Sequence, residues 1–412
     1  MKTKMRFGLS ALFVAMLLVS MALVPGAMAA QPEDKYNVTI EKAFDHANAH
    51  MIDFVTANTS GFEQWKGASI NPEPLELYDI NGKKLFYLFS IYNNNEMVGR
   101  MKLSANKVLG HSVQTFEFDP KPLNVDEAIK QSLEIANEKF PAGDVKSTKM
   151  VVYSYPKIGA MTVVADNVTG EEYRIIVDAY TLDMIPDKSP AETESGVWSM
   201  YEPISKEEMI NNVDKWYNSD NYTKALNKET AAKGLDIHKP LSEEELDILE
   251  ESQVITSIGS TELDVRLFGQ EKDYYCAPAT AQMIADYYDV GHSQTHIARE
   301  MGTSTIGTTM NGQLAYYTGD LPYCLGKSGS DDDYTCDWTE ATGEIDNGRP
   351  LKSGIPVHVS GTVGHARACI GYMEFAEIKY LSINDPWPVN EGNHYLENWD
   401  LTTHGNYIYV RD

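Results

Sequence analysis

The C-terminal part of the chain contains four residues whose side chains can together catalyse acyl transfer. Cys276 follows Gln270 by six residues, and His365 and Asp385 come further along. A cysteine thiolate attacks a carbonyl carbon when a histidine takes the thiol proton and a carboxylate orients that histidine. A glutamine amide donates to the oxyanion that develops. The set predicts Cys276 as nucleophile, His365 as general base and acid, Asp385 as orienting carboxylate and Gln270 in the oxyanion hole.

The residues after Cys276 predict a helix that begins at the nucleophile. Pro278 suits a first helical turn, and Ala279, Met283 and Tyr287 recur on one face. The unpaired N–H groups and the dipole at the start of a helix favour a thiolate over a thiol. This position therefore lowers the expected pKa of Cys276.

Two predicted strands carry the other members of the set. Residues 364–372 form a short apolar run with His365 near its start, and residues 381–387 form a second run that ends in Asp385. We expect the two strands to form a hairpin beside the Cys276 helix. That arrangement brings the imidazole between the thiol and the carboxylate.

These motifs resemble a known family. The residues that carry the likeness are Gln270-x5-Cys276-Ala277-Pro278-Ala279, Gly307-Thr308-Thr309, Gly364-His365, Gly371-Tyr372 and Asn384-Asp385-Pro386. Residues 262–412 resemble the papain-like cysteine peptidases of the bacteriocin-processing, double-glycine leader type. The resemblance implies a nucleophile-bearing helix packed on an antiparallel sheet, and the four roles given above. The chain departs from the family at Ala277, where the family usually has glycine.

The preceding part of the chain predicts an α+β domain with an antiparallel sheet. Its pattern gives helices over 40–55 and 125–140 and strands over 84–92, 96–103, 149–155, 160–166 and 172–179. Residues 84–112 resemble pro-domains of streptopain-type peptidases, and residues 125–186 resemble secreted domains of the PepSY sort. These likenesses imply an inhibitory or folding-assisting pro-domain. A spacer or recognition module is the alternative.

We divide the chain into four segments. Residues 1–30 join a basic start to an apolar run and Ala27-Met28-Ala29, which is typical of a secretory signal peptide. Residues 31–190 form the α+β domain, 191–260 a polar helical connector, and 261–412 the peptidase domain. The signal predicts a secreted or cell-envelope-associated protein with no stable membrane insertion once it is removed.

Composition narrows the partners. The formal net charge of −26 becomes −29 when the three basic residues of the signal are removed, which disfavours nucleic acid. His292 and His296 have the spacing of a metal pair, but no glutamate follows His292 as in a zinc-peptidase helix. We expect no metal and no cofactor. Asp331-Asp332-Asp333 predicts a solvated acidic turn.

Four cysteines in a chain predicted to be exported suggest a disulfide. Cys324 and Cys336 bracket a polar stretch that reads as a flexible loop, and we expect them to pair. Cys276 and Cys369 then stay free. A resting disulfide between Cys276 and Cys369 is the alternative.

The sequence as a whole predicts a secreted cysteine peptidase that acts on a peptide or protein substrate through a Cys276 thioester. The likenesses of the N-terminal domain imply that it inhibits the peptidase as part of a zymogen, and a spacer or recognition module is the alternative. The same four residues also suit an amidase or a peptide ligase. An alternative of another class is a non-catalytic cell-surface binding protein that keeps a papain-like shell, with Cys276 misaligned or blocked.

Overall fold

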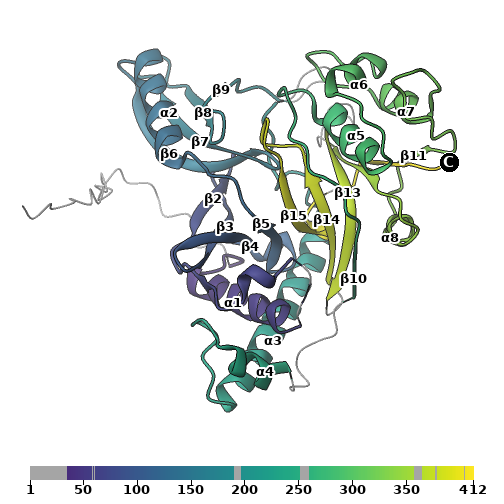
Figure 1. Cartoon of the computed structure of the whole chain (residues 1–412). Coiled ribbons are helices and arrows are strands. Elements are labelled where there is room, and N and C mark those ends of the chain that lie inside the picture. The colour runs from purple at the N-terminus through teal and green to yellow at the C-terminus, as the bar shows by residue number, and fades with distance from the viewer. Residues whose placement is uncertain are drawn as a thin grey trace, which may run out of the picture. The chain divides into compact units, whose positions relative to one another are not determined.

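The computed structural model describes residues 35–57, 59, 61–189, 196–250, 259–356, 364–375, 378–402 and 404–412. The described strands join in one sheet in the order β11-β16-β12-β13-β14-β15-β5-β4-β3-β2-β6-β7-β8-β9. Among the paired strands of the described residues, only β2 and β6 run parallel. Figure 1 shows the sheet and the helices beside it. The predicted mixture of helices with a mostly antiparallel sheet is confirmed.

The N-terminal part contains the two helices and the strands that were expected, with shifted ends. Its elements are α1 (Ile40–Thr56), β1 (Ser69–Ile70), β2 (Leu75–Asp79), β3 (Lys84–Asn93), β4 (Glu96–Ser104), β5 (Val113–Phe118), α2 (Val125–Lys139), β6 (Asp144–Ser154), β7 (Lys157–Ala165), β8 (Glu172–Asp178) and β9 (Met184–Ile185), with 3-10 turns at Glu63–Trp65 and Lys107–Leu109. The strands β1, β2, β5 and β9 were not predicted, and β5 proves central to the fold.

Two helices follow, in the segment predicted to be a helical connector. α3 (Lys206–Ala232) begins with a capping box, in which the Ser205 hydroxyl accepts from Glu208 N–H and the Glu208 carboxylate accepts from Ser205 N–H. α4 (Glu243–Glu250) follows Ser242, which makes the same reciprocal contacts with Glu245. Both helices therefore begin at a Ser-x-x-Glu capping box.

The C-terminal part places helices on one end of the sheet. Its elements are β10 (Gly259–Glu262), α5 (Cys276–Tyr287), α6 (Gln294–Glu300), α7 (Met310–Thr318), β11 (Asp331–Asp333), α8 (Trp338–Asp346), β12 (Leu351–Pro356), β13 (Gly364–Phe375), β14 (Ile378–Asp385), β15 (Asn393–Asn398) and β16 (Asn406–Tyr409), with a 3-10 turn at Trp399–Leu401. The expected hairpin is β13 with β14, in which Ala368 lies opposite Asn384.

The two parts share both a sheet and a hydrophobic core. β15 pairs with β5 from His394–Phe118 to Glu397–Thr115, and β5 lies near β15 in Figure 1. Phe54 of α1 packs on Phe375 with ring centroids 5.1 Å apart. Residues Tyr36–Asp412 accordingly form one compact unit. The domain boundaries drawn from the sequence stay predictions, and the signal-peptide segment lies outside the described residues.

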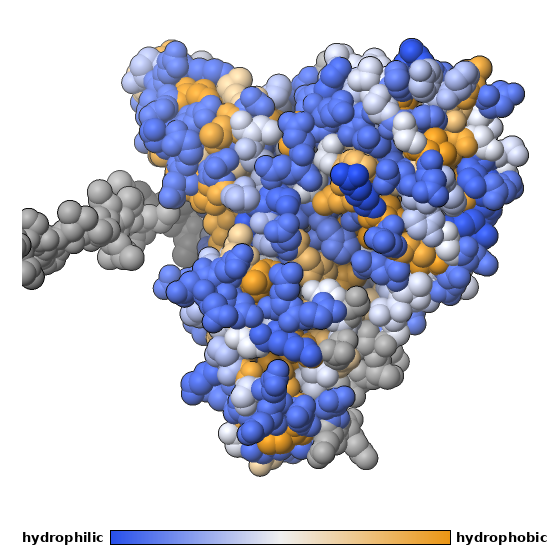
Figure 2. Space-filling model, in the orientation of Figure 1, coloured by the Kyte–Doolittle hydropathy of each residue, from blue (hydrophilic) through white to orange (hydrophobic). Residues whose placement is uncertain are grey.

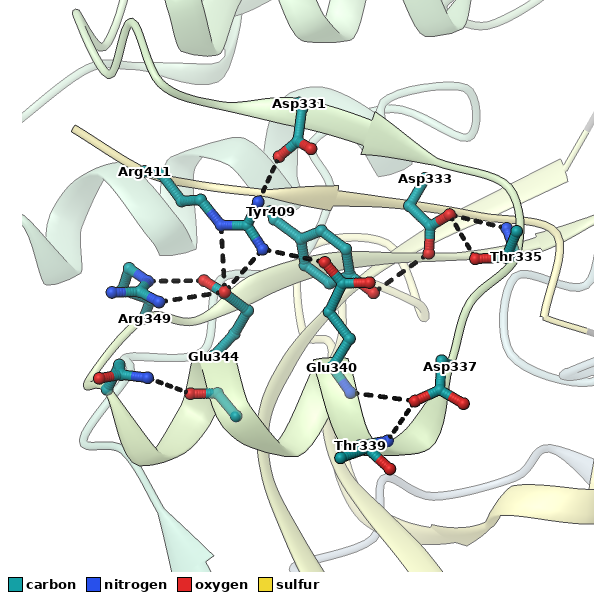
Figure 3. Close-up of polar contacts among 12 residues, drawn as sticks. Asp331, Asp333, Thr335, Asp337, Thr339, Glu340, Glu344, Arg349, Tyr409 and Arg411 are labelled. Atoms are coloured by element: carbon teal, nitrogen blue, oxygen red, sulfur yellow. Dashed lines mark hydrogen bonds and ion pairs between the residues drawn. The ribbon is translucent and has the colours of Figure 1, made fainter.

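Ion pairs hold the C-terminal end of the chain against α8 (Figure 3). Arg411 donates to Glu344 at 2.7 Å, to Glu340 at 3.1 Å and to Asp331 at 2.9 Å. Arg349 donates to Glu344 as well, at 2.6 Å. Asp331 belongs to β11, which pairs with β16. The solvated acidic turn predicted for Asp331-Asp332-Asp333 is therefore wrong. These aspartates form the edge strand β11, which pairs with β16.

The same strand explains why the expected disulfide is absent. All four cysteines are free thiols. The polar stretch between Cys324 and Cys336 is not a flexible loop, since β11 within it is paired with β16. Cys336 packs with Trp338 in a buried cluster and its thiol donates to the Asp333 carbonyl at 3.6 Å. The Cys324–Cys336 pairing predicted from the sequence is wrong in this structure.

The visible surface is largely polar. Figure 2 shows a face that is mostly hydrophilic, with apolar residues in separate patches. Among the described residues, no helix is both long and apolar enough to cross a membrane.

Candidate active site

Helix α5 presents Cys276 at its first residue, as the sequence predicted. Its small residues Ala277, Ala281 and Ala285 lie in a buried cluster with Ala366 and other residues of β13. Alanines on both sides allow the helix to approach the strand closely. This packing brings the thiol to the start of β13, where His365 lies.

The β13–β14 hairpin brings His365 and Asp385 together. The imidazole Nε2 of His365 lies 2.6 Å from Oδ1 of Asp385. The carboxylate also accepts from the backbone N–H of Trp387 at 2.8 Å and from the hydroxyl of Tyr395 at 2.7 Å. Three donors fix the buried carboxylate in place. Because Nε2 is occupied, Nδ1 is the ring nitrogen left for the thiol.

The three groups shift one another's pKa values. Burial raises the pKa of the Cys276 thiol, but a hydrogen bond from His365 and its charge outweigh burial and lower the pKa below the ordinary value. Burial lowers the pKa of His365, while the charge of Asp385 and a hydrogen bond to it raise that pKa to about 9. Burial raises the pKa of Asp385, and the charge of His365 brings it below its usual value. The site therefore favours a thiolate–imidazolium pair.

Gln270 lies in a loop whose backbone forms hydrogen bonds with the segment after Asp385. Its backbone N–H donates to the Pro386 carbonyl at 2.9 Å, and its carbonyl accepts from Asn390 N–H at 2.8 Å. The side-chain amide donates to the Lys272 carbonyl at 2.7 Å. Its oxygen is buried without a partner among the described residues. The structure thus ties Gln270 to the Asp385 loop, and its amide points to Lys272 rather than to the thiol.

A buried network lies behind the carboxylate. Arg367 is fully buried and donates to Tyr395 at 3.1 Å and to both oxygens of Glu397 at 2.8 Å. The hydroxyl of Tyr155 donates to Glu397 at 2.6 Å. Tyr155 belongs to the N-terminal part, between β6 and β7. Both parts of the chain therefore contribute to the polar framework that supports Asp385.

Cys369 takes no part in this site. It packs with Leu351, Ile383 and other residues in one buried cluster, whereas its neighbours Ala368 and Ile370 belong to the cluster that contains α5. Alternate residues of a strand face opposite sides of the sheet. Cys369 therefore lies on the face away from α5, and a resting disulfide with Cys276 is wrong for this arrangement.

Two cavities meet at Cys276 and His365. One of about 120 Å³ is also lined by Ser154, Tyr155, Lys157 and Trp198 from the preceding part of the chain. The other, of about 350 Å³, is also lined by Ala277, Met310, Lys352 and Asn406. A substrate chain that passes the thiol has room on both sides of it. Ala277, the residue that departs from the family pattern, forms part of the larger cavity.

Sequence reasoning missed two lysines at this site. The ammonium of Lys352 is buried. Burial lowers its pKa to about 8, although the negative charge of the Cys276 thiolate acts in the opposite direction and raises it. The positive charge of Lys157 contributes to the low pKa of the Cys276 thiol. Nothing local marks Lys157, because it comes from a hairpin more than a hundred positions before the nucleophile. Lys352 carries a weak signal, because it is the one charged residue of the strand β12.

Comparison with protein families finds a match in the C-terminal part. Residues 262–409 match the model of the Peptidase_C39 like family. This match supports a C39-type cysteine peptidase in that part of the chain. The likenesses predicted for the N-terminal part stay predictions.

Comparison with solved structures gives a distant likeness. The crystal structure of a candidate C39-like peptidase from Bacillus anthracis aligns at 13% identity with a TM-score of 0.29, over 37% of this chain and 98% of that one. None of the curated proteins matches the chain.

Proposed function

We propose that the protein is a cysteine peptidase that hydrolyses peptide bonds through a thioester on Cys276. One observation carries the proposal: His365 lines the same two cavities as Cys276, and its Nε2 lies 2.6 Å from Oδ1 of Asp385. The family match over residues 262–409 supports it. The alternative of a non-catalytic binding protein predicted a misaligned or blocked Cys276, and a free Cys276 thiol whose pKa is lowered by His365 weighs against it.

In the first half of the proposed reaction, the Cys276 thiolate attacks the carbonyl carbon of the scissile peptide bond. The electron pair of the carbonyl moves to its oxygen. The first-turn N–H groups of α5 and an amide N–H of Gln270 stabilise this oxyanion. Gln270 uses one amide hydrogen for Lys272, and the second remains for the substrate. The imidazolium of His365 then gives its Nδ1 proton to the leaving amine, and a thioester forms.

In the second half, neutral His365 takes a proton from water, and the resulting hydroxide attacks the thioester. The carboxylic acid leaves, and the sulfur returns to the thiolate beside a protonated His365. Asp385 stays ionised and keeps the imidazole in position throughout. An amine in place of water would make the same thioester an intermediate of ligation, which is the related activity predicted from the sequence.

Labelling and turnover test this proposal together. The protein comprising residues 31–412 is incubated with a thiol-reactive probe, and the labelled site is mapped by mass spectrometry. We expect Cys276 to react faster than the other three cysteines at neutral pH, and Cys276→Ala to abolish cleavage of a mixed peptide library. A library cleaved equally well by Cys276→Ala would overturn the proposal. Adding a peptide amine to the assay separates ligation from hydrolysis by product mass.

We also propose that the enzyme is exported, on the basis of the signal pattern in residues 1–30. The mature N-terminus of protein recovered outside the producing cell tests this directly. A start near residue 31 supports export, and a full-length product retained inside the cell contradicts it.

A further inference from the structure

The smaller cavity beside the nucleophile has walls from distant parts of the chain. Ser154 ends β6 and Lys157 begins β7, so the tip of this hairpin reaches the cavity that Cys276 and His365 line. The hydroxyl of Tyr155, at the same hairpin tip, donates a hydrogen bond to the buried carboxylate of Glu397. This anchor holds the hairpin tip against the sheet that carries His365. The position of Lys157 is therefore set by the fold and not by a free loop.

Lys157 brings a positive charge to this cavity without a matching carboxylate. Its ammonium lies 4.3 Å from the centre of the Trp387 ring, and it interacts electrostatically with the Cys276 thiol. Among the described residues it has no ion pair. Lys146, on the same hairpin, differs because it pairs with Asp144 at 2.6 Å. The half-buried charge of Lys157 is thus available to a ligand.

The ligand that satisfies such a charge is an anion, and in a peptide the anion is a carboxylate. A cavity of about 120 Å³ accepts a short side chain or a chain end rather than an extended segment. Asp273 also lines this cavity, but it is exposed and forms no ion pair with Lys157. The net charge of −26 repels acidic substrates in general. A local cation is therefore needed to seat a carboxylate here.

We propose that Lys157 is a specificity residue that binds a substrate carboxylate next to the scissile bond. This inference rests on the proposed peptidase function and deepens it by naming a substrate class. The carboxylate belongs either to the C-terminus of the peptide or to an aspartate or glutamate side chain. In both cases the N-terminal part of the chain supplies a wall of the working site.

A pair of alkylating reagents tests the cavity without any peptide. Iodoacetate and iodoacetamide attack the same thiolate and differ in a carboxylate, so the ratio of their rate constants at Cys276 cancels changes in the thiolate fraction. We expect Lys157→Met to lower the iodoacetate-to-iodoacetamide ratio by about fivefold, the scale of one partly exposed charge pair. Lys146→Met is the matched control and should leave the ratio at the wild-type value. An unchanged ratio in Lys157→Met overturns the proposal.

Four peptides then identify the source of the carboxylate. They share one sequence and carry a free or amidated C-terminus, each with glutamate or glutamine beside the cleaved bond. A preference for the free C-terminus that Lys157→Met removes assigns the terminal carboxylate, and a preference for glutamate assigns the side chain. Equal cleavage of all four by the wild type overturns the substrate class.

The two experiments also separate this inference from the proposed function. If Cys276 reacts no faster than an ordinary thiol and no peptide is cleaved, the peptidase function fails. The reagent ratio still reports in that case whether the cavity prefers a carboxylate. If peptides are cleaved but the iodoacetate-to-iodoacetamide ratio is the same in Lys157→Met as in the wild type, the peptidase function stands and the proposed role of Lys157 in specificity is wrong.

Discussion

The hydroxyl of Tyr155 donates a 2.6 Å hydrogen bond to Glu397 across 242 positions of sequence. Glu397 pairs with Arg367, Arg367 donates to Tyr395, and Tyr395 donates to Asp385. A hairpin of the N-terminal part is thus connected through buried polar groups to the carboxylate that orients His365.

Removing the Tyr155 hydroxyl should destabilise the fold measurably. Tyr155→Phe takes one donor from a buried, charged acceptor, which costs about 1.5 to 3 kcal/mol. The measurement is the urea midpoint, followed by fluorescence. Tyr173→Phe is a matched control, because Tyr173 donates to Glu171 at 2.7 Å on the surface. We expect the control to keep the wild-type midpoint, and equal midpoints for both variants would contradict the prediction.

Breaking the buried ion pair should cost more than breaking the hydrogen bond. Arg367→Met leaves the Glu397 carboxylate buried without its cation, at a cost of about 3 to 5 kcal/mol. The double variant Arg367→Met with Glu397→Leu removes both charges and should recover much of that stability. A double variant as unstable as the sum of the single variants would show that the two residues do not interact.

The pH dependence of the thiol should report His365. Because the pKa of Cys276 is lowered, alkylation by iodoacetamide should already be fast at neutral pH. The His365 pKa is raised to about 9, so the imidazolium persists through neutral pH and is lost as pH rises through that value. Hydrolysis should fall there. In His365→Ala, the alkylation midpoint should rise to at least that of an ordinary thiol, about 8.5, because burial still raises the pKa of Cys276. A midpoint that stays at the wild-type value would exclude His365 as the cause.

Replacing the orienting carboxylate should change both rate and pH profile. Asp385→Asn removes the charge that raises the pKa of His365. The high-pH limb of the pH–rate profile, where activity declines, should therefore move below about pH 9. The rate constant kcat should drop on the order of a hundredfold or more, because the imidazole loses its preferred tautomer. Tyr395→Phe keeps the carboxylate and removes one of its donors, and it should shift the limb less. An unmoved limb in Asp385→Asn would rule out this role.

Deletion of the N-terminal part should prevent folding of the peptidase domain. Removing residues 31–250 would expose Phe375 and Tyr380, which pack on Phe54 and Phe116, and would leave β15 without β5. We expect an insoluble product, or a soluble one without dispersed amide signals in NMR spectra. Deletion of residues 1–34 alone is the control and should leave the fold intact. A folded and active fragment 251–412 would instead support the removable pro-domain predicted from the sequence.

Local features of the chain were predictable because they depend on near neighbours. The helix begins near Cys276 because Pro278 has no N–H to donate and is tolerated only in the first turn of a helix. The β13–β14 hairpin follows from two apolar runs a few residues apart. The order of nucleophile, base and carboxylate along the chain therefore pointed to a cysteine peptidase before any geometry was known.

The tertiary structure decided the rest, because it depends on contacts between distant segments. No local pattern says that β5 pairs with β15, that Lys157 lines the same cavity as Cys276, or that β11, which lies between Cys324 and Cys336 in the sequence, pairs with β16. Each contact is set by which apolar faces bury one another when the whole chain collapses. The sequence by itself determined the chemistry available at Cys276. Only the fold determined that the N-terminal part helps to build the site where that chemistry takes place.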